Sequence, residues 1–74
     1  MVTLEQIRMR VAEAIKQSGL TQTELARRLR IGQQTISHYV KGDKMPALDT
    51  FANLCAVLDL DANDILCIND HPRT

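Results

Sequence analysis

The stretch that decides the fold is residues 21–42, TQTELARRLRIGQQTISHYVKG. Thr21 stands three residues before Glu24, which is the capping-box spacing, in which two side chains satisfy two backbone N–H groups at a helix start. Apolar residues at helical spacing predict one helix over about residues 22–29 and another over about residues 33–40. Because only residues 30–32 connect the two, the stretch predicts short helices that cross steeply and do not lie antiparallel.

Helical periodicity continues on both sides of this stretch. A first helix is expected over about residues 3–18, with Gly19 as its stop. After a loop that contains Pro46, a fourth helix is expected over about residues 48–58, and Asp61 is expected to cap a short fifth helix that runs to about Cys67. The predicted fold class is all-α, with five short helices around one core and residues 69–74 frayed. The apolar positions assigned to the inner faces include Leu4, Ile7, Val11, Ile15, Leu25, Ala26, Leu29, Ile36, Leu48, Phe51, Leu54 and Leu58.

Length and composition narrow the class of protein. The 74 residues are 45% hydrophobic, 24% charged and 3% aromatic, which is typical of one small soluble domain and excludes disorder and a disulfide scaffold. No run approaches the roughly 18 apolar residues of a membrane span. Two cysteines without secretory features indicate reduced thiols and a cytoplasmic location. A core this small leaves little room to enclose a catalytic pocket, so neither an enzyme, a cofactor nor a small-molecule ligand is expected.

The charges are distributed unevenly, although the formal net charge is zero. Residues 1–44 carry eight basic and four acidic side chains, whereas residues 45–74 carry one basic and five acidic. The two parts therefore have net charges of +4 and −4, which would allow one basic face. Ordinary solvated charges on helix surfaces would explain the same pattern.

The predicted third helix presents an unusual outer face. With Ile36, Tyr39 and Val40 directed inward, its outward positions are Gln33, Gln34, Thr35, Ser37, His38 and Lys41. Glutamine can bond bidentately to adenine in the DNA major groove, and serine and threonine can contact bases or phosphate. Lysines just beyond the helix could neutralise phosphates, and backbone N–H groups at helix starts could bind them.

These residues resemble a known family. The segments Thr21-Gln22-x-Glu24-Leu25-Ala26 and Gln33-Gln34-Thr35-Ile36-Ser37, followed by Gly42 and Pro46, are similar to the helix-turn-helix of the phage-repressor/Cro (XRE-type) family. The resemblance extends from about Ile7 to Ile68 and implies a five-helix, lambda-repressor-like DNA-binding domain, here residues 1–68. The family roles, carried onto matching positions and extended to neighbouring outward and basic side chains, predict base contacts by Gln33, Gln34, Ser37 and His38, and backbone contacts by Gln22, Thr35, Arg30, Lys41 and Lys44.

The chain departs from the family pattern at three places. Arg30 stands where the family usually has glycine, so it must adopt a left-handed conformation at some cost or turn differently. Tyr39-Val40 replaces the frequent Trp-Glu, and Ala47 replaces the usual serine or threonine cap of the fourth helix. None of these changes removes the predicted reading face, which is the outward side of the third helix with Gln33, Gln34, Ser37 and His38.

Cysteine and histidine leave a metal site or a catalytic pair to consider. Cys67 and His71 stand four residues apart, but only Cys55 and His38 remain to complete a structural zinc site, which needs about four ligands. Cys55 lies in an apolar stripe and is expected to be a buried small hydrophobe. A catalytic Cys-His pair has the same candidates and no evident oxyanion donor. No metal and no catalytic residue are predicted.

The resemblance implies a transcriptional regulator, and we expect a repressor. A homodimer on a palindromic operator would place its two third helices about 34 Å apart in successive major grooves. The apolar segment from Leu60 to Ile68 is expected to contribute to self-association. The alternative is a protein-interaction module, such as an antitoxin or adaptor, in which DNA binding is secondary.

Overall fold

The chain folds into five helices joined by short turns. The computed structural model describes residues 1–68, and within this range it contains no strand. The helices are α1 (Leu4–Gln17), α2 (Gln22–Leu29), α3 (Gln33–Lys41), α4 (Leu48–Leu58) and α5 (Ala62–Ile65). The all-α, five-helix prediction is confirmed, although α5 ends at Ile65 and not near Cys67. The frayed tail expected at residues 69–74 lies outside the described residues.

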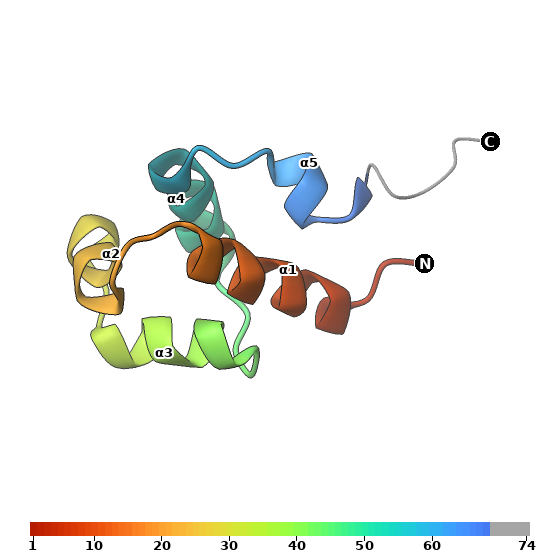
Figure 1. Cartoon of the computed structure of the whole chain (residues 1–74). Coiled ribbons are helices and arrows are strands. Elements are labelled where there is room, and N and C mark those ends of the chain that lie inside the picture. The colour runs from red at the N-terminus through yellow and green to blue at the C-terminus, as the bar shows by residue number, and fades with distance from the viewer. Residues whose placement is uncertain (69–74) are drawn as a thin grey trace.

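The helices pack around α1. In Figure 1, α3 lies along one side of α1, α4 and α5 lie on the other side, and α2 closes one end of the molecule. α1 packs against α3 and α5, while α2 packs against α3 and α4. The N-terminal turns of α1 and the last described residues lie together at the end away from α2 (Figure 1). This arrangement leaves one long side of α3 facing solvent.

The core confirms most of the apolar pattern. Leu25, Ile36, Leu54 and Val11 are the largest fully buried side chains, each less than 2% exposed. Leu58 is only partly buried, and two predicted inner residues are wrong: Leu4 is 62% exposed and Leu48 is 85% exposed. Each of these two leucines occupies the first turn of its helix, before the turns that pack on the core.

Helix starts follow the predicted capping chemistry only in part. The Thr21 Oγ1 accepts a hydrogen bond from the backbone N–H of Glu24 at 3.1 Å, as the capping box requires. The reciprocal bond predicted from Glu24 is not made, because its carboxylate accepts hydrogen bonds from Arg27 and Arg28. The complete box lies instead at the start of α1, where Thr3 and Gln6 bond each other's backbone N–H groups.

Arg10 connects the first helix to the last. Its Nη1 donates a hydrogen bond to the backbone carbonyl of Asp64 at 3.1 Å. Ile65 of α5 is buried beside this contact, and Cys67 just beyond it is 3% exposed. α5 has four residues, so tertiary contacts of this kind provide most of its stability.

Across residues 1–68, no helix has the length and apolar character that crossing a bilayer requires.

Candidate nucleic-acid interface

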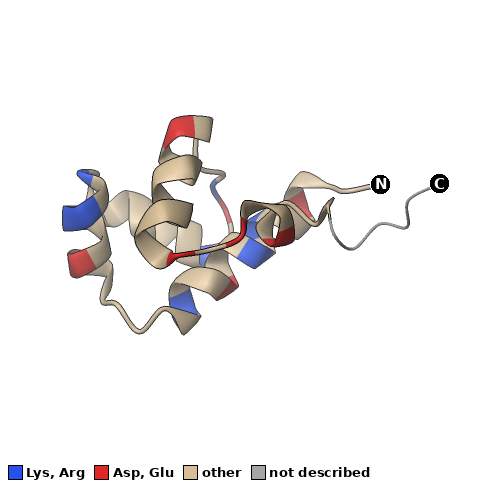
Figure 2. Cartoon of the chain, turned by 90° about the horizontal axis from the view of Figure 1, so that it is seen from above, with Lys and Arg blue, Asp and Glu red and all other residues tan. Residues whose placement is uncertain are grey.

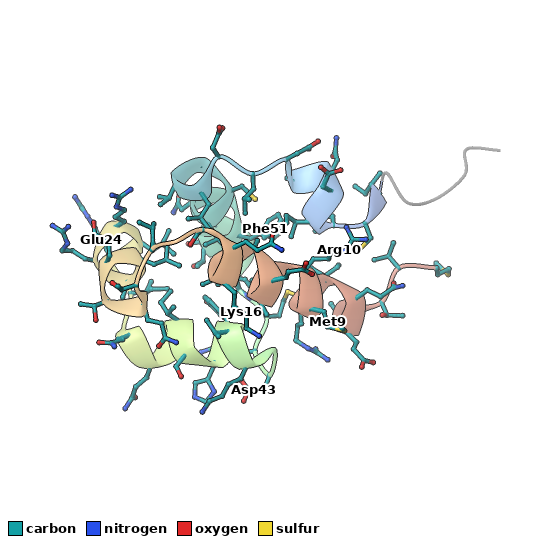
Figure 3. All side chains as sticks on the ribbon, viewed as in Figure 1. Met9, Arg10, Lys16, Glu24, Asp43 and Phe51 are labelled. Carbon is teal, nitrogen blue, oxygen red and sulfur yellow. The ribbon has the colours of Figure 1, made fainter. Side chains whose placement is uncertain are left out.

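α3 separates its apolar and polar residues onto two faces. Ile36 is fully buried and Tyr39 is 4% exposed, and burial raises the pKa of the Tyr39 hydroxyl, so it stays protonated. The predicted contact residues lie on the other side of the helix. Of these, Gln33, Gln34, His38 and Lys41 are exposed, whereas Thr35 and Ser37 are half-buried. Positions 33, 34, 37, 38 and 41 fall within one arc of the helix. Figure 3 shows side chains of α3 directed away from α1. Lys41, at the end of this arc, also borders α1.

The start of α3 has no side-chain cap. Gly32 occupies the N-cap position, and the first turn contains no acidic residue. The N–H of Thr35 bonds the Gly32 carbonyl at 3.1 Å, while the first N–H groups of a helix have no intrahelical acceptor. The helix dipole adds partial positive charge at this end. The backbone of Gln33 and Gln34 therefore presents donors that suit an anion.

The turn between α2 and α3 contains a left-handed residue that is not glycine. Arg30 has φ 57° and ψ 42°, which is the first of the two alternatives considered for its replacement of the family glycine. The turn is closed by the N–H of Ile31, which bonds the Ala26 carbonyl at 3.1 Å. A side chain in this region costs about 1 kcal/mol or more relative to glycine. The exposed guanidinium forms no ion pair with any acid of the described residues.

The other two arginines of this segment are already paired. Glu24 accepts from Arg27 at 2.6 Å and from Arg28 at 3.0 Å. These hydrogen bonds, first from Arg27 and then from Arg28, lower the pKa of the Glu24 carboxyl. The pairing supports the interpretation of Arg27 and Arg28 as charges of the α2 surface. Figure 2 shows these basic and acidic segments side by side on α2, with further acidic segments along α4 and the connection to α5.

His38 also has a partner within the chain. Its Nδ1 lies 2.9 Å from Oδ1 of Asp43, beyond the C-terminal Gly42 of α3. Asp43 additionally donates its backbone N–H to the His38 carbonyl at 3.2 Å. We did not anticipate this contact, although an acid five residues after the histidine, with a glycine between them, was a usable signal. The contact holds the imidazole toward the end of α3.

Comparison with known protein families identifies the pair formed by α2 and α3. The helix-turn-helix family model matches residues 11–65, which include every helix-turn-helix residue described above. The chain belongs to the helix-turn-helix family. The XRE-type resemblance is confirmed, and the protein is a DNA-binding transcription regulator that acts on double-stranded DNA. No curated protein and no solved structure matches the chain significantly.

The remaining predicted contacts of this helix-turn-helix protein lie at both ends of the helix pair. Gln22 is the half-buried first residue of α2, directly after the Thr21 cap. Lys41 ends α3, and Lys44 is exposed in the following loop. Neither lysine forms an ion pair within residues 1–68. The structure therefore places one cation at the C-terminal end of α3, another just beyond it, and unpaired backbone donors at the start of the helix.

The cysteines of the helix-turn-helix protein are buried. Both are unbridged thiols. Burial, with a smaller contribution from the nearby Asp61 charge, raises the pKa of the Cys55 thiol. A protonated, buried thiol is a poor nucleophile. Residues 1–68 contain no group of three metal-ligating side chains, and His71 of the considered zinc set lies outside the described residues.

Proposed function

We propose that this protein is a repressor that reads a specific DNA sequence through the outer face of α3, with residues 1–68 as its DNA-binding domain. The observation that carries the proposal is the exposed Gln33-Gln34 pair at a helix start that no side chain caps. Glutamine amides can bond bidentately to adenine, and each such contact contributes about 1–3 kcal/mol of discrimination. Ser37, one turn further along the same face, would contact the next bases.

His38 completes the base contacts in this proposal. Because Nδ1 lies against Asp43, Nε2 is the ring atom that remains for a base edge or the groove wall. The contact with Asp43 also fixes the orientation of the ring before DNA binds. His38 therefore enters the groove at the C-terminal end of the reading face.

The backbone contacts would come from residues around the reading face. Gln22 would bind phosphate at the N-terminus of α2, and Thr35 would do so beside the α3 start. The cations Arg30, Lys41 and Lys44 would neutralise phosphates, which is supported by their lack of acidic partners in the described part of the chain. These contacts fix the register of the protein on the duplex without reading its sequence.

The protein would bind as a homodimer to a palindromic operator. One domain of this size buries little surface on DNA, and a second copy doubles the contact. The structure changes our expectation for the segment 60–68, because Ile65 and Cys67 are buried within their own chain. The apolar side chain left for self-association there is chiefly Ile68, which is 52% exposed. Replacement of Ile68 by Asp should then lower dimer content in analytical ultracentrifugation and leave the helical signal unchanged.

The decisive experiment is the selection of bound duplexes from a randomised DNA pool. A palindrome with half-sites about one helical turn apart is expected. Occupancy of that palindrome within a promoter should then lower transcription of a reporter gene. If the chain is folded and helical but enriches no sequence, the proposal is wrong, and a protein-interaction module such as an antitoxin or adaptor becomes the better explanation.

A further inference from the structure

A hollow lies between α1 and the C-terminal end of α3. It has a volume of about 300 Å³ and is lined by Met9, Ala12, Glu13, Lys16, Val40, Lys41 and Gly42. Figure 3 places Met9 and Lys16 on the side of α1 that faces α3, and Arg10 on the side that faces α5. The hollow therefore borders the end of the face proposed to enter the major groove.

Two lysines from different helices stand on either side of this hollow. Lys16 and Lys41 are exposed, and neither forms an ion pair in the described part of the chain. The nearest acid along α1, Glu13, instead accepts a hydrogen bond from Gln17 at 3.0 Å. By contrast, Arg27 and Arg28 are held by Glu24. The protein thus leaves unpaired cations beside α3 and pairs those on the outer side of α2.

We propose that Lys16 is a phosphate-binding residue that acts with Lys41 across this hollow. The inference rests on the proposed placement of α3 in the major groove, which brings a DNA strand past the C-terminal end of α3. Each strand offers one phosphate per 3.4 Å of helix axis, so cations on two sides of the hollow can meet neighbouring phosphates. DNA would then be held by α1 as well as by the helix-turn-helix pair.

The lining of the hollow fits a sugar-phosphate chain better than a compact anion. Met9 is 64% exposed and, with Val40, adds an apolar surface to the same lining. Glu13 contributes one negative charge against two positive ones, and its carboxylate already receives the Gln17 amide. A free inorganic phosphate would meet this mixed surface without a deep enclosure, whereas a DNA strand can contact both its lysines and its apolar side chains.

The test is the salt dependence of DNA affinity for matched variants. Lys16→Met and Lys41→Met remove one charge each and keep a good helix former of similar length. Each should reduce the magnitude of the negative slope of log K against log salt by about 0.9, and the double variant by about twice that value. Lys16→Arg should keep the wild-type slope. Arg27→Met is the control, because it removes the same charge at a residue that already forms an ion pair with Glu24.

The slopes should be measured on the selected operator and on a random duplex. Unchanged sequence preference with a reduced slope for Lys16→Met supports a phosphate contact. If Lys16→Met keeps the wild-type slope while Lys41→Met lowers it, or if Arg27→Met lowers it equally, the role assigned to Lys16 is wrong. Failure of the proposed function is a separate result, in which the wild type does not prefer any operator over the random duplex.

Discussion

In α2, Thr21 caps the first turn, and Glu24 holds the two arginines of the last turn. In α3, the helix begins at Gly32 without a side-chain cap, and its first turn carries two glutamines and no acid. Both helices bury a fully enclosed aliphatic residue, Leu25 in α2 and Ile36 in α3. The two helices are therefore anchored alike and differ in how their polar groups are satisfied.

The difference indicates that α2 mainly stabilises the fold, whereas α3 keeps its polar groups available for a ligand. Polar groups satisfied within α2 stabilise the fold and leave fewer donors for a ligand. Polar groups of α3 that have no partner within the protein form hydrogen bonds to water in the unbound state. Replacing these hydrogen bonds by hydrogen bonds to DNA costs little free energy. The two strategies make different predictions for substitutions in the two helices.

The largest expected effect is loss of the shared anchoring. Leu25→Ala and Ile36→Ala should each lower the free energy of unfolding by about 2–5 kcal/mol, because each creates a cavity at a fully buried site. Urea unfolding followed by circular dichroism measures the loss. Ala56→Ser, an exposed change in α4, should alter the free energy by less than about 0.5 kcal/mol. A loss for only one of the two variants would show that the helices are not anchored alike.

The next largest effect is expected on sequence-specific DNA binding, which should depend on α3 and not on α2. Gln34→Ala is expected to reduce the preference for the operator over a random duplex by about 1–3 kcal/mol, because a bidentate base contact is removed. Thr23→Ala, an exposed polar change in α2, is the matched control and should leave this preference unchanged. Competition binding at fixed salt measures both. An intact preference in Gln34→Ala would contradict the assignment of α3 as the reading helix.

Removing the side-chain cap of α2 and adding one to α3 should have opposite effects on stability. Thr21→Ala should lower the free energy of unfolding by about 1 kcal/mol, since the N–H of Glu24 loses its acceptor. Gly32→Asp should instead raise it by a few tenths of a kcal/mol, because a carboxylate caps α3 and complements its dipole. The same carboxylate would repel phosphate, so DNA affinity should fall although stability rises. Affinity unchanged in Gly32→Asp would mean that the α3 start lies away from DNA.

A smaller effect is expected at the turn between the helices. Arg30→Gly should raise the free energy of unfolding by less than the steric cost of the side chain, by up to about 1 kcal/mol, because glycine adopts the left-handed conformation freely but also gains freedom in the unfolded chain. If Arg30 contacts phosphate, the magnitude of the negative slope of log K against log salt should also fall by about 0.9. Calorimetry and salt titration give the two results independently. A more stable variant with the wild-type slope would remove Arg30 from the DNA contacts.

The smallest expected effect is on the pH dependence of stability, and it arises from the ion pairs of α2. The arginines lower the pKa of Glu24 from its ordinary value of 4.5, so its stabilising pairing is complete above that pH. The contribution is lost as the pH falls below 4.5 and through the lowered pKa of the folded protein. Glu24→Gln should therefore flatten the acid side of a stability-versus-pH curve measured by thermal unfolding. A curve of unchanged shape would show that solvent screens this exposed pairing fully.

The sequence was sufficient for elements that depend on local chemistry. Helical periodicity located α1 to α4 to within about one residue, and the missing family glycine limited Arg30 to a left-handed conformation or a different turn, of which the first is observed. It was insufficient where a neighbour decides the outcome. Two arginines bind the Glu24 carboxylate in place of its capping bond, while Leu4 and Leu48, each the first residue of its helix, are left exposed. α5 ends early because Cys67 takes a left-handed conformation, with φ 64°.

The candidate site was predictable to the level of which side chains face outward. The outward face of α3 follows from the positions of Ile36 and Tyr39 alone. The contact between His38 and Asp43 depends on the geometry of the Gly42 turn, which periodicity does not describe. The hollow beside Lys16 depends on how α1 crosses α3, so no local pattern could have placed that lysine near the reading helix.

The short last helix, α5, determines how fast backbone amide protons at this end of the molecule exchange with solvent. Four residues cannot hold a helix in water, so α5 persists through Ile65 and the bond from Arg10 to the Asp64 carbonyl. Opening this end breaks few contacts, and its amide protons should exchange with solvent faster than those of the helix-turn-helix pair. A dimer joined through this end could therefore separate by local opening, while each subunit keeps its reading helix in place.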